Sequence, residues 1–293
     1  MPNTKQTLLI FIALFCTYFF WGSTYLAIRF GIESFPPFML AGLRYLVAGL
    51  FLYLVIRTMG CRNPTCTEWK GAAIIGVLLP VMGNGTVCFV QQTVSSSVAA
   101  LSIATVPVWM AIFSTFWGHH ITKREWIGIV VGFLGILLLN LGGSLHGELS
   151  SALLLILAAA SWSFGSVWAK HLPMPQGLMG AACQMLIGGL VLMVVSTFSG
   201  EIWPTTVSNK SWAAMMFLVL FSSLATYSAY QWLLKNVAPL VASSNTFVNP
   251  IVAFIVGVIF ANETIADNEY IALALIIVGV VLILTSNTKK EII

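Results

Sequence analysis

Charged residues are scarce in this sequence. Only 22 of its 293 residues are Lys, Arg, Asp or Glu, which is 8% of the chain, whereas about a quarter of the residues of a soluble domain are charged. No charged residue occurs between Gly71 and Thr122, and 59% of all residues are hydrophobic. Such a chain has too little polar surface to cover a globule in water, so a soluble fold is excluded.

Groups for metal, redox or proton chemistry are also missing. The five cysteines are scattered, and Cys61 and Cys66 share a loop without the four ligands that a structural zinc site needs. No Asp or Glu lies clearly inside an apolar run, so the buried carboxylate of a typical proton-coupled pump is not visible. There is no phosphate-binding P-loop. We therefore expect no metal, no cofactor and no drive by ATP.

Long apolar runs dominate instead. A transmembrane helix needs about 20 mostly apolar residues. Segments of this kind cover residues 8–28, 37–57, 72–92, 97–117, 126–144, 150–170, 177–198, 211–232, 239–260 and 270–287. The first has no small-residue cleavage site, so we interpret it as a span and not as a signal peptide. The sequence predicts an all-α membrane protein with ten transmembrane helices.

Lys and Arg residues are distributed unevenly between the loops of this predicted arrangement. With the N-terminus inside, the outer segments hold only Arg29 and Lys210, and nearly all other basic residues fall in cytoplasmic segments. Basic loops favour the cytoplasmic side of a membrane. We therefore expect both termini in the cytoplasm and a multi-pass protein of the cytoplasmic or inner membrane. The net charge of +4 reflects this orientation and not an affinity for nucleic acid.

The two halves of the chain resemble one another. The run WGSTYLAIR at 21–29 recurs as WSFGSVWAK at 162–170, and AGLRYLVAG at 41–49 recurs as AACQMLIGG at 181–189. Two later matches follow in the same order and bring Pro107 into register with Pro250 and Gly135 into register with Gly279. Five spans are an odd number, so the second half enters the membrane from the opposite side. We predict an inverted 5+5 repeat, residues 1–146 and 147–293, as in many secondary transporters.

Arg44 is the one charge in the interior of a predicted span, away from the span ends. It shares a helix face with Ala41 and Ala48, and the repeat aligns it with Gln184. A charge at the middle of a bilayer costs about 2.5–3.5 kcal/mol on insertion scales, so its side chain should face protein or water. Two interpretations stay open: Arg44 contacts a solute, or it binds backbone carbonyls of broken helices and only holds the bundle together.

Large amide and aromatic side chains inside other spans complete a candidate central cavity. The predicted cavity residues are Trp21, Tyr25, Arg44, Asn84, Trp162, Gln184, Tyr227, Gln231, Asn245 and Asn249. Mid-span prolines at Pro80, Pro107 and Pro250 predict helix kinks, and the GNG run at 83–85 favours local unwinding. GIVVG at 128–132 has the spacing of a helix-packing face. That face could serve within one chain or between the two chains of a homodimer.

In order and spacing, these motifs resemble the EamA family of the drug/metabolite transporter superfamily. The resemblance rests on WGSTYLAIR and its variant, LRYLVAG in the second span, the prolines of the fourth and ninth spans, and FVNPIVAFIVGVIFANET at 247–264. Family members commonly have an acidic residue after the fourth and ninth spans; Glu263 fits the second position, but His120 stands at the first. The resemblance implies export or exchange of small metabolites, amino acids or drugs.

The sequence thus predicts a secondary transporter that works by alternating access, with a small-molecule substrate and the lipid bilayer as its partners. An aromatic and amide-lined cavity with one cation points to amphipathic or carboxylate-bearing solutes. A channel lined by the same residues is an alternative. A membrane-embedded enzyme is another, although the short loops carry no cluster of catalytic groups.

Overall fold

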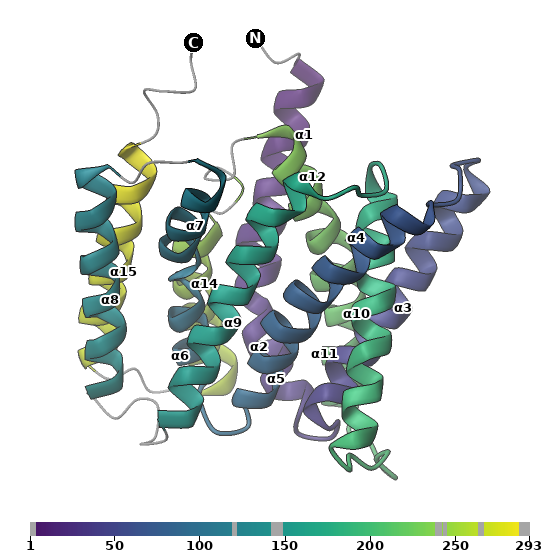
Figure 1. The fold of residues 1–293 in the computed structure, drawn as a ribbon. Coiled ribbons are helices and arrows are strands. Elements are labelled where there is room, and N and C mark those ends of the chain that lie inside the picture. Colours follow the sequence, from purple (N-terminus) through teal and green to yellow (C-terminus); the bar gives the residue numbers. More distant parts are fainter. Residues whose placement is uncertain are drawn as a thin grey trace.

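The computed structural model describes residues 4–118, 122–141, 149–237, 242, 245–262 and 267–286, and all regular structure within these ranges is helical (Figure 1). Seven segments are long and apolar enough to cross a membrane: Gln6–Gly31, Pro37–Thr58, Cys66–Val90, Ser96–Trp117, Ser150–His171, Leu178–Phe198 and Asn209–Asn236. Val248–Ala261 is a shorter apolar helix. The all-helical membrane fold is confirmed; the count of ten spans, the inverted repeat and the side of the termini remain predictions.

The helices follow the predicted apolar runs. In chain order they are α1 (Thr4–Phe15), η1 (Cys16–Phe20), α2 (Trp21–Gly31), α3 (Pro37–Thr58), α4 (Cys66–Gly76), η2 (Val77–Gly85), α5 (Thr86–Val90), α6 (Ser96–Ile103), α7 (Val106–Ser114), η3 (Thr115–Trp117), α8 (Lys123–Leu141), α9 (Leu149–Trp168), η4 (Ala169–His171), α10 (Leu178–Phe198), α11 (Asn209–Phe217), η5 (Leu218–Tyr227), α12 (Ser228–Asn236), α14 (Asn245–Ala261) and α15 (Asp267–Ser286). His120 and Glu263, which the family resemblance singled out, lie outside the described residues. In Figure 1, α1 begins and α15 ends at the same end of the bundle.

One boundary differs from the prediction for a local reason. The helix that contains the third span begins at Cys66, six residues before the apolar run, because Thr65 and Glu68 form a capping box. The Thr65 hydroxyl accepts a hydrogen bond from the Glu68 amide, and the Glu68 carboxylate accepts one of 2.7 Å from the Thr65 amide. This box satisfies amide groups that a helix start leaves without partners.

The three mid-span prolines have different surroundings. Pro80 lies inside η2, so the predicted unwinding near residues 80–87 takes the form of a wide π-helix that runs to Gly85. Pro107 is the second residue of α7, just after the break that ends α6. Pro250 lies inside α14, which is helical from Asn245 to Ala261. A second long π-helix, η5, replaces the α-helix in the middle of Asn209–Asn236.

Small residues let two pairs of helices meet at their backbones. Helix α3 packs along α10, and α8 packs along α15 at one side of the bundle (Figure 1). At Gly49 of α3, an added Cβ would lie 2.8 Å from the Leu186 amide nitrogen. At Gly279 of α15, it would lie 2.6 Å from the Gly128 carbonyl oxygen. The GIVVG face of 128–132 therefore packs within the chain, and association between two chains stays a prediction.

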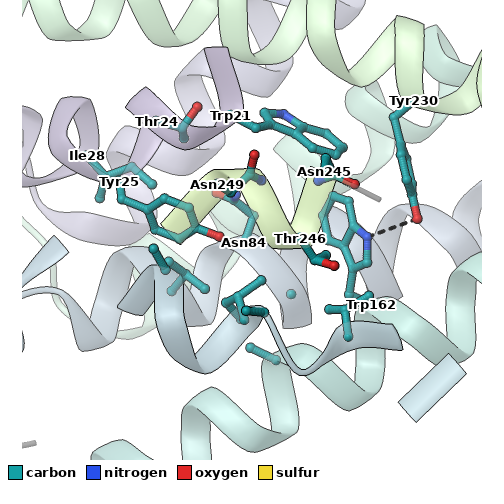
Figure 2. A pocket seen from close by; sticks show the side chains of 17 residues that line it. Trp21, Thr24, Tyr25, Ile28, Asn84, Trp162, Tyr230, Asn245, Thr246 and Asn249 are labelled. Atoms are coloured by element: carbon teal, nitrogen blue, oxygen red, sulfur yellow. Dashed lines mark hydrogen bonds between the residues drawn. The ribbon is translucent and has the colours of Figure 1, made fainter. Parts of the chain in front are cut away.

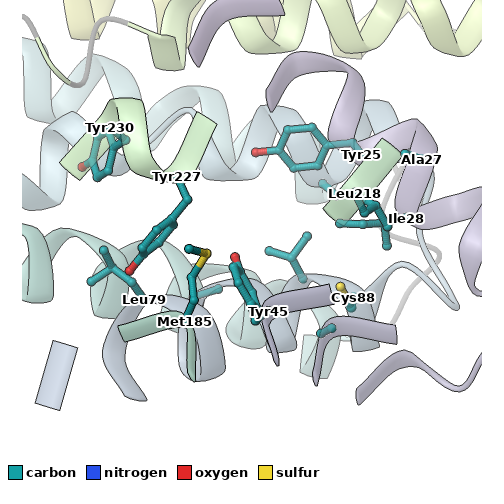
Figure 3. Packing of buried hydrophobic residues seen from close by; sticks show 14 of the residues in the cluster. Tyr25, Ala27, Ile28, Tyr45, Leu79, Cys88, Met185, Leu218, Tyr227 and Tyr230 are labelled. Atoms are coloured by element: carbon teal, nitrogen blue, oxygen red, sulfur yellow. The ribbon is translucent and has the colours of Figure 1, made fainter. Parts of the chain in front are cut away.

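The outside of the bundle is apolar and its centre is partly polar. Phe51 and Ile255 are 56% and 54% exposed, whereas Arg44 and Gln184 are 0% and 1% exposed. The core around these polar groups contains Tyr45 and Tyr227, with ring centroids 5.9 Å apart. Figure 3 shows the two rings among apolar side chains. An apolar exterior around a polar centre is expected of a protein whose solvent is lipid.

Candidate functional site

A cavity lies in the middle of the bundle, and we call it the central cavity. Helices α2, η2, α5, α6, α7, α9, α12 and α14 surround it (Figure 2). Its lining residues are Trp21, Thr24, Tyr25, Ile28, Gly83, Asn84, Val87, Ala100, Ile103, Ala104, Val106, Ala158, Trp162, Tyr230, Asn245, Thr246 and Asn249. The free volume is about 60 Å³, well below the ~300–1,000 Å³ of a typical small-molecule site. A metabolite therefore needs a wider state of the protein.

Three aromatic side chains form one wall of the central cavity. The rings of Trp21 and Trp162 are 5.4 Å apart and nearly perpendicular, and Tyr230 lies 5.0 Å from Trp21 and 5.7 Å from Trp162. Trp21 Nε1 donates to the Ser222 carbonyl at 3.2 Å, and Trp162 Nε1 donates to Tyr230 Oη at 3.3 Å. Because each indole N–H already has a partner, the rings offer the cavity their apolar faces.

Three asparagines supply the polar groups. In the orientation that satisfies both atoms of its amide, Asn249 donates to the Thr17 carbonyl at 3.0 Å and accepts from Asn245 Nδ2 at 3.1 Å. Asn84 Oδ1 accepts a hydrogen bond from Arg44 and a weak one from Cys88 Sγ at 3.6 Å. Asn245 is 4% exposed and its Oδ1 has no hydrogen-bond partner. A buried carbonyl oxygen without a donor is costly, so Asn245 Oδ1 is available to a solute or a water molecule.

Arg44 does not line the central cavity, but it is hydrogen-bonded to Asn84, which does. It donates to Asn84, to Ser222 Oγ at 3.3 Å and to Tyr45 Oη at 3.2 Å. Its guanidinium carbon is 4.5 Å from the centroid of the Tyr45 ring. These partners are side chains, not the backbone carbonyls named in one of the two interpretations left open by the sequence. Arg44 therefore reaches the cavity indirectly, through Asn84 and through Ser222, whose Oγ also accepts a hydrogen bond of 3.0 Å from the lining residue Thr24.

The other predicted residues form a second polar group. Tyr227 Oη donates a hydrogen bond of 2.6 Å to Gln184 Oε1. Gln184 and Gln231 line a different cavity, which lies between α9, α10 and α12 and has a volume of about 360 Å³. The structure thus brings six of the predicted residues to the central cavity: Trp21, Tyr25, Asn84, Trp162, Asn245 and Asn249.

Several lining residues are absent from the predicted set. Thr24 follows Trp21 by three residues, and Tyr230 follows Tyr227 by three, so each lies on the same helix face as a predicted residue. Thr246 directly follows Asn245. The helical spacing could have found the first two, but single Thr and Tyr residues are common in spans and do not distinguish a cavity from a packed interface.

A sequence model of the EamA-like transporter family matches residues 8–141 and 149–285. The chain belongs to this family. An uncharacterized inner membrane transporter of Escherichia coli K12, YedA, is 41% identical over 95% of this chain and 92% of its own length. An uncharacterized transporter of Bacillus subtilis, YoaV, is 26% identical over 89% of this chain and 91% of its own.

The EamA-like fold also has a solved counterpart. One crystal structure superposes with a TM-score of 0.66 over 99% of this chain and 100% of its own, at 18% identity, which is a likeness of fold alone. Family membership makes this chain a multi-pass membrane protein of a transporter family, and its relatives are named as transporters and not as enzymes. The resemblance predicted from its motifs is confirmed.

Proposed function

We propose that this EamA-family protein is a secondary transporter of small organic solutes, such as amino acids or drugs, that exports or exchanges them by alternating access. The observation that carries the proposal is the composition of the central cavity. Trp21 and Asn84 come from residues 1–146, and Trp162 and Asn249 come from residues 147–293. A site shared by two halves can be opened to either side when one half moves against the other.

The narrowness of the central cavity supports a closed state of such a cycle. Its free volume of about 60 Å³ leaves no room for a continuous pore. Two long π-helices, η2 and η5, contain the polar residues Asn84 and Tyr227. π-Helical turns often occur at functional sites, where their wide geometry weakens the regular helix ladder. We propose that these two segments bend when the cavity opens, and that both termini lie in the cytoplasm.

The test is flux through purified protein in liposomes. A thermal-shift screen against metabolites and drugs selects solutes, and counterflow measures whether loaded solute drives uptake of the labelled form. We expect saturable counterflow for at least one selected solute. Asn245→Leu should reduce it at least fivefold, because the unpartnered carbonyl is lost; the matched variant Asn63→Leu, in an exposed loop, should not.

Other outcomes separate the alternatives. Flux that is not saturable and shows no counterflow would identify a channel. Chemical turnover of a solute without flux would identify an enzyme. Absence of flux for every solute that stabilises the protein would contradict the transport proposal itself.

A further inference from the structure

The second cavity is larger than the central one and has a different character. Its walls include Lys170 and Lys235, and Gln184, Gln231 and Ser166 also line it. We call it the lysine cavity. Among the described residues that line it, none is acidic. Its volume of about 360 Å³ falls within the ~300–1,000 Å³ range of small-molecule sites.

The lysine cavity lies at one end of the bundle. It is formed where α9 and α12 end and α10 begins, which is the end at which α1 begins and α15 ends (Figure 1). Both lysines are exposed there, and Lys235 Nζ donates to the Pro175 carbonyl at 3.3 Å. The charged groups among the described lining residues are two ammonium groups, and such a lining attracts anions and repels cations.

A buried amide adds a polar group without a partner. Gln231 is 6% exposed, and its Nε2 has no hydrogen-bond partner. A buried amide that lacks an acceptor costs free energy, which a ligand oxygen can recover. The lysines and this amide nitrogen are all hydrogen-bond donors, so the lysine cavity suits a ligand that only accepts, and an ionised carboxylate is such a ligand.

One layer of side chains separates the lysine cavity from the central cavity. Tyr230 lines the central cavity, and its Oη is 2.9 Å from Oγ of Ser166, which lines the lysine cavity. Trp162 Nε1 donates to the same Tyr230 oxygen, as the dashed line in Figure 2 shows. A solute that passes between the two cavities needs these hydrogen bonds to break.

We propose that the lysine cavity binds the carboxylate group of a small organic solute on its path to or from the central cavity. The inference rests on the proposed transport function, because it names the substrate class of the same path. Lys170 and Lys235 supply the attraction, Gln231 donates a hydrogen bond, and the apolar part of the solute points toward the aromatic wall. Neutral analogues can accept a hydrogen bond and make the apolar contact, but they lack the charge attraction of the two lysines.

The test compares an acid with its neutral counterpart of equal shape. Purified protein in phosphatidylcholine nanodiscs is titrated by calorimetry with 3-phenylpropionate and with 3-phenylpropionamide. Two exposed ion pairs together are worth about tenfold in affinity, so we expect the acid to bind about tenfold more tightly. Lys170→Gln/Lys235→Gln should remove that preference, and the control Lys70→Gln/Lys210→Gln should keep it. Equal binding, binding of neither compound, or a preference that survives in the first double variant would overturn the proposal.

Two further arms assign a failure to its cause. The titration is repeated with phosphatidylglycerol in the nanodiscs at 0.15 M salt, where screening limits the effect of surface charge. We expect acid binding to persist; its loss would show that a lipid phosphate occupies the lysine cavity and would overturn the solute proposal. Lysine-dependent binding without any counterflow would contradict the transport function alone, and counterflow of neutral solutes without acid preference would contradict the carboxylate site alone.

Discussion

The Tyr227 hydroxyl donates a hydrogen bond of 2.6 Å to Gln184 Oε1, and both side chains are fully buried. The predicted repeat aligns Gln184 with Arg44. Asn84 lies in the third span of the first half and Tyr227 in the third span of the second half, and Arg44 donates to Asn84. Each predicted half therefore has one polar bond between its second and third spans. The chemistry differs: a cation donates to an amide in the first half, and a phenol donates to an amide in the second.

We expect Tyr227→Phe to destabilise the protein. The ring is kept, but Gln184 Oε1 loses its donor in a buried site, which costs about 1–3 kcal/mol. Thermal unfolding in detergent measures the change. The control is Tyr53→Phe, whose hydroxyl lies 3.3 Å from Asn63 Oδ1 near a loop; it should stay within about 0.5 kcal/mol of the original protein.

The double variant Tyr227→Phe/Gln184→Leu tests the same hydrogen bond by a double-mutant cycle. When both polar partners are gone, no acceptor is left buried without a donor. The double change should therefore destabilise less than the sum of the two single changes. Strictly additive free energies would show that the two groups do not interact in the folded protein.

Much of the site could be predicted because the sequence repeat places matching residues in both halves of the chain. Trp21 and Trp162 are aligned in the two halves, and their rings meet at 5.4 Å in the central cavity. The same logic did not reach the lysine cavity. The sequence places Lys170 and Lys235 only among the basic residues of the predicted cytoplasmic segments. That both line one cavity depends on the turn after α9 and on the end of α12, which apolar periodicity does not determine.

Of the two long π-helices, the sequence predicts one and misses the other. Pro80 and the glycines at 83 and 85 predict an irregular helix, and η2 is irregular. The segment of η5 has neither proline nor glycine, yet it is π-helical at the corresponding place. A π-helix there depends on packing against neighbouring helices, which the local sequence does not encode.

The pattern of contacts between helices supports the proposed alternating-access cycle. Helix α9 packs against η2, and α2 packs against α11 and η5. Likewise α14 packs against α2, and α6 and α7 pack against α9. Under the predicted repeat, the contact of α9 with η2 corresponds to the contacts of α2 with α11 and η5. The contact of α14 with α2 corresponds in the same way to the contacts of α6 and α7 with α9. Helices α3 and α10 are equivalent in the two halves, and so are α8 and α15. A second state can then arise when the two halves exchange their conformations.

Arg44→Gln tests what the lone buried cation does. Glutamine keeps a hydrogen bond to Asn84 or Ser222, and removal of a buried charge offsets part of the lost contacts, so the free energy of unfolding should fall by less than about 2 kcal/mol. The Asn84 side chain loses its charged donor, so we expect the counterflow rate or the choice of solute to change at least about fivefold.

Arg57→Gln is the matched control for Arg44→Gln, because Arg57 donates to the Cys61 carbonyl near a loop. Neither stability nor counterflow should change in that variant. If Arg44→Gln loses stability while its solute behaviour is unchanged, the arginine only holds the helices together.

Gly279→Ala tests the packing of α8 against α15. The new methyl group would meet the Gly128 carbonyl oxygen at 2.6 Å and the Gly132 amide nitrogen at 2.7 Å. Both atoms are backbone, so the helices must move apart, at a cost of about 1–3 kcal/mol in the free energy of unfolding. Ala274→Leu, at an exposed position of the same helix, should have little effect. An unchanged stability together with an altered oligomeric state would place this face between two chains.

Tyr230→Phe tests the layer of side chains that separates the central cavity from the lysine cavity. The variant keeps the ring but loses the hydrogen bonds to Ser166 at 2.9 Å and to Trp162 at 3.3 Å. Each hydrogen bond is worth about 1 kcal/mol. The closed state should lose more of this stabilisation than the open state, so the layer between the two cavities should open about fivefold more often. We expect faster counterflow together with a fall of about 1–3 kcal/mol in the free energy of unfolding, because the Trp162 and Ser166 groups lose a hydrogen-bond partner. Tyr270→Phe, at an exposed position on α15, serves as the control and should exchange at the original rate. Unchanged or slower exchange by a folded Tyr230→Phe protein would mean that the barrier to passage lies elsewhere, because loss of these two bonds can only loosen the layer that Tyr230 forms.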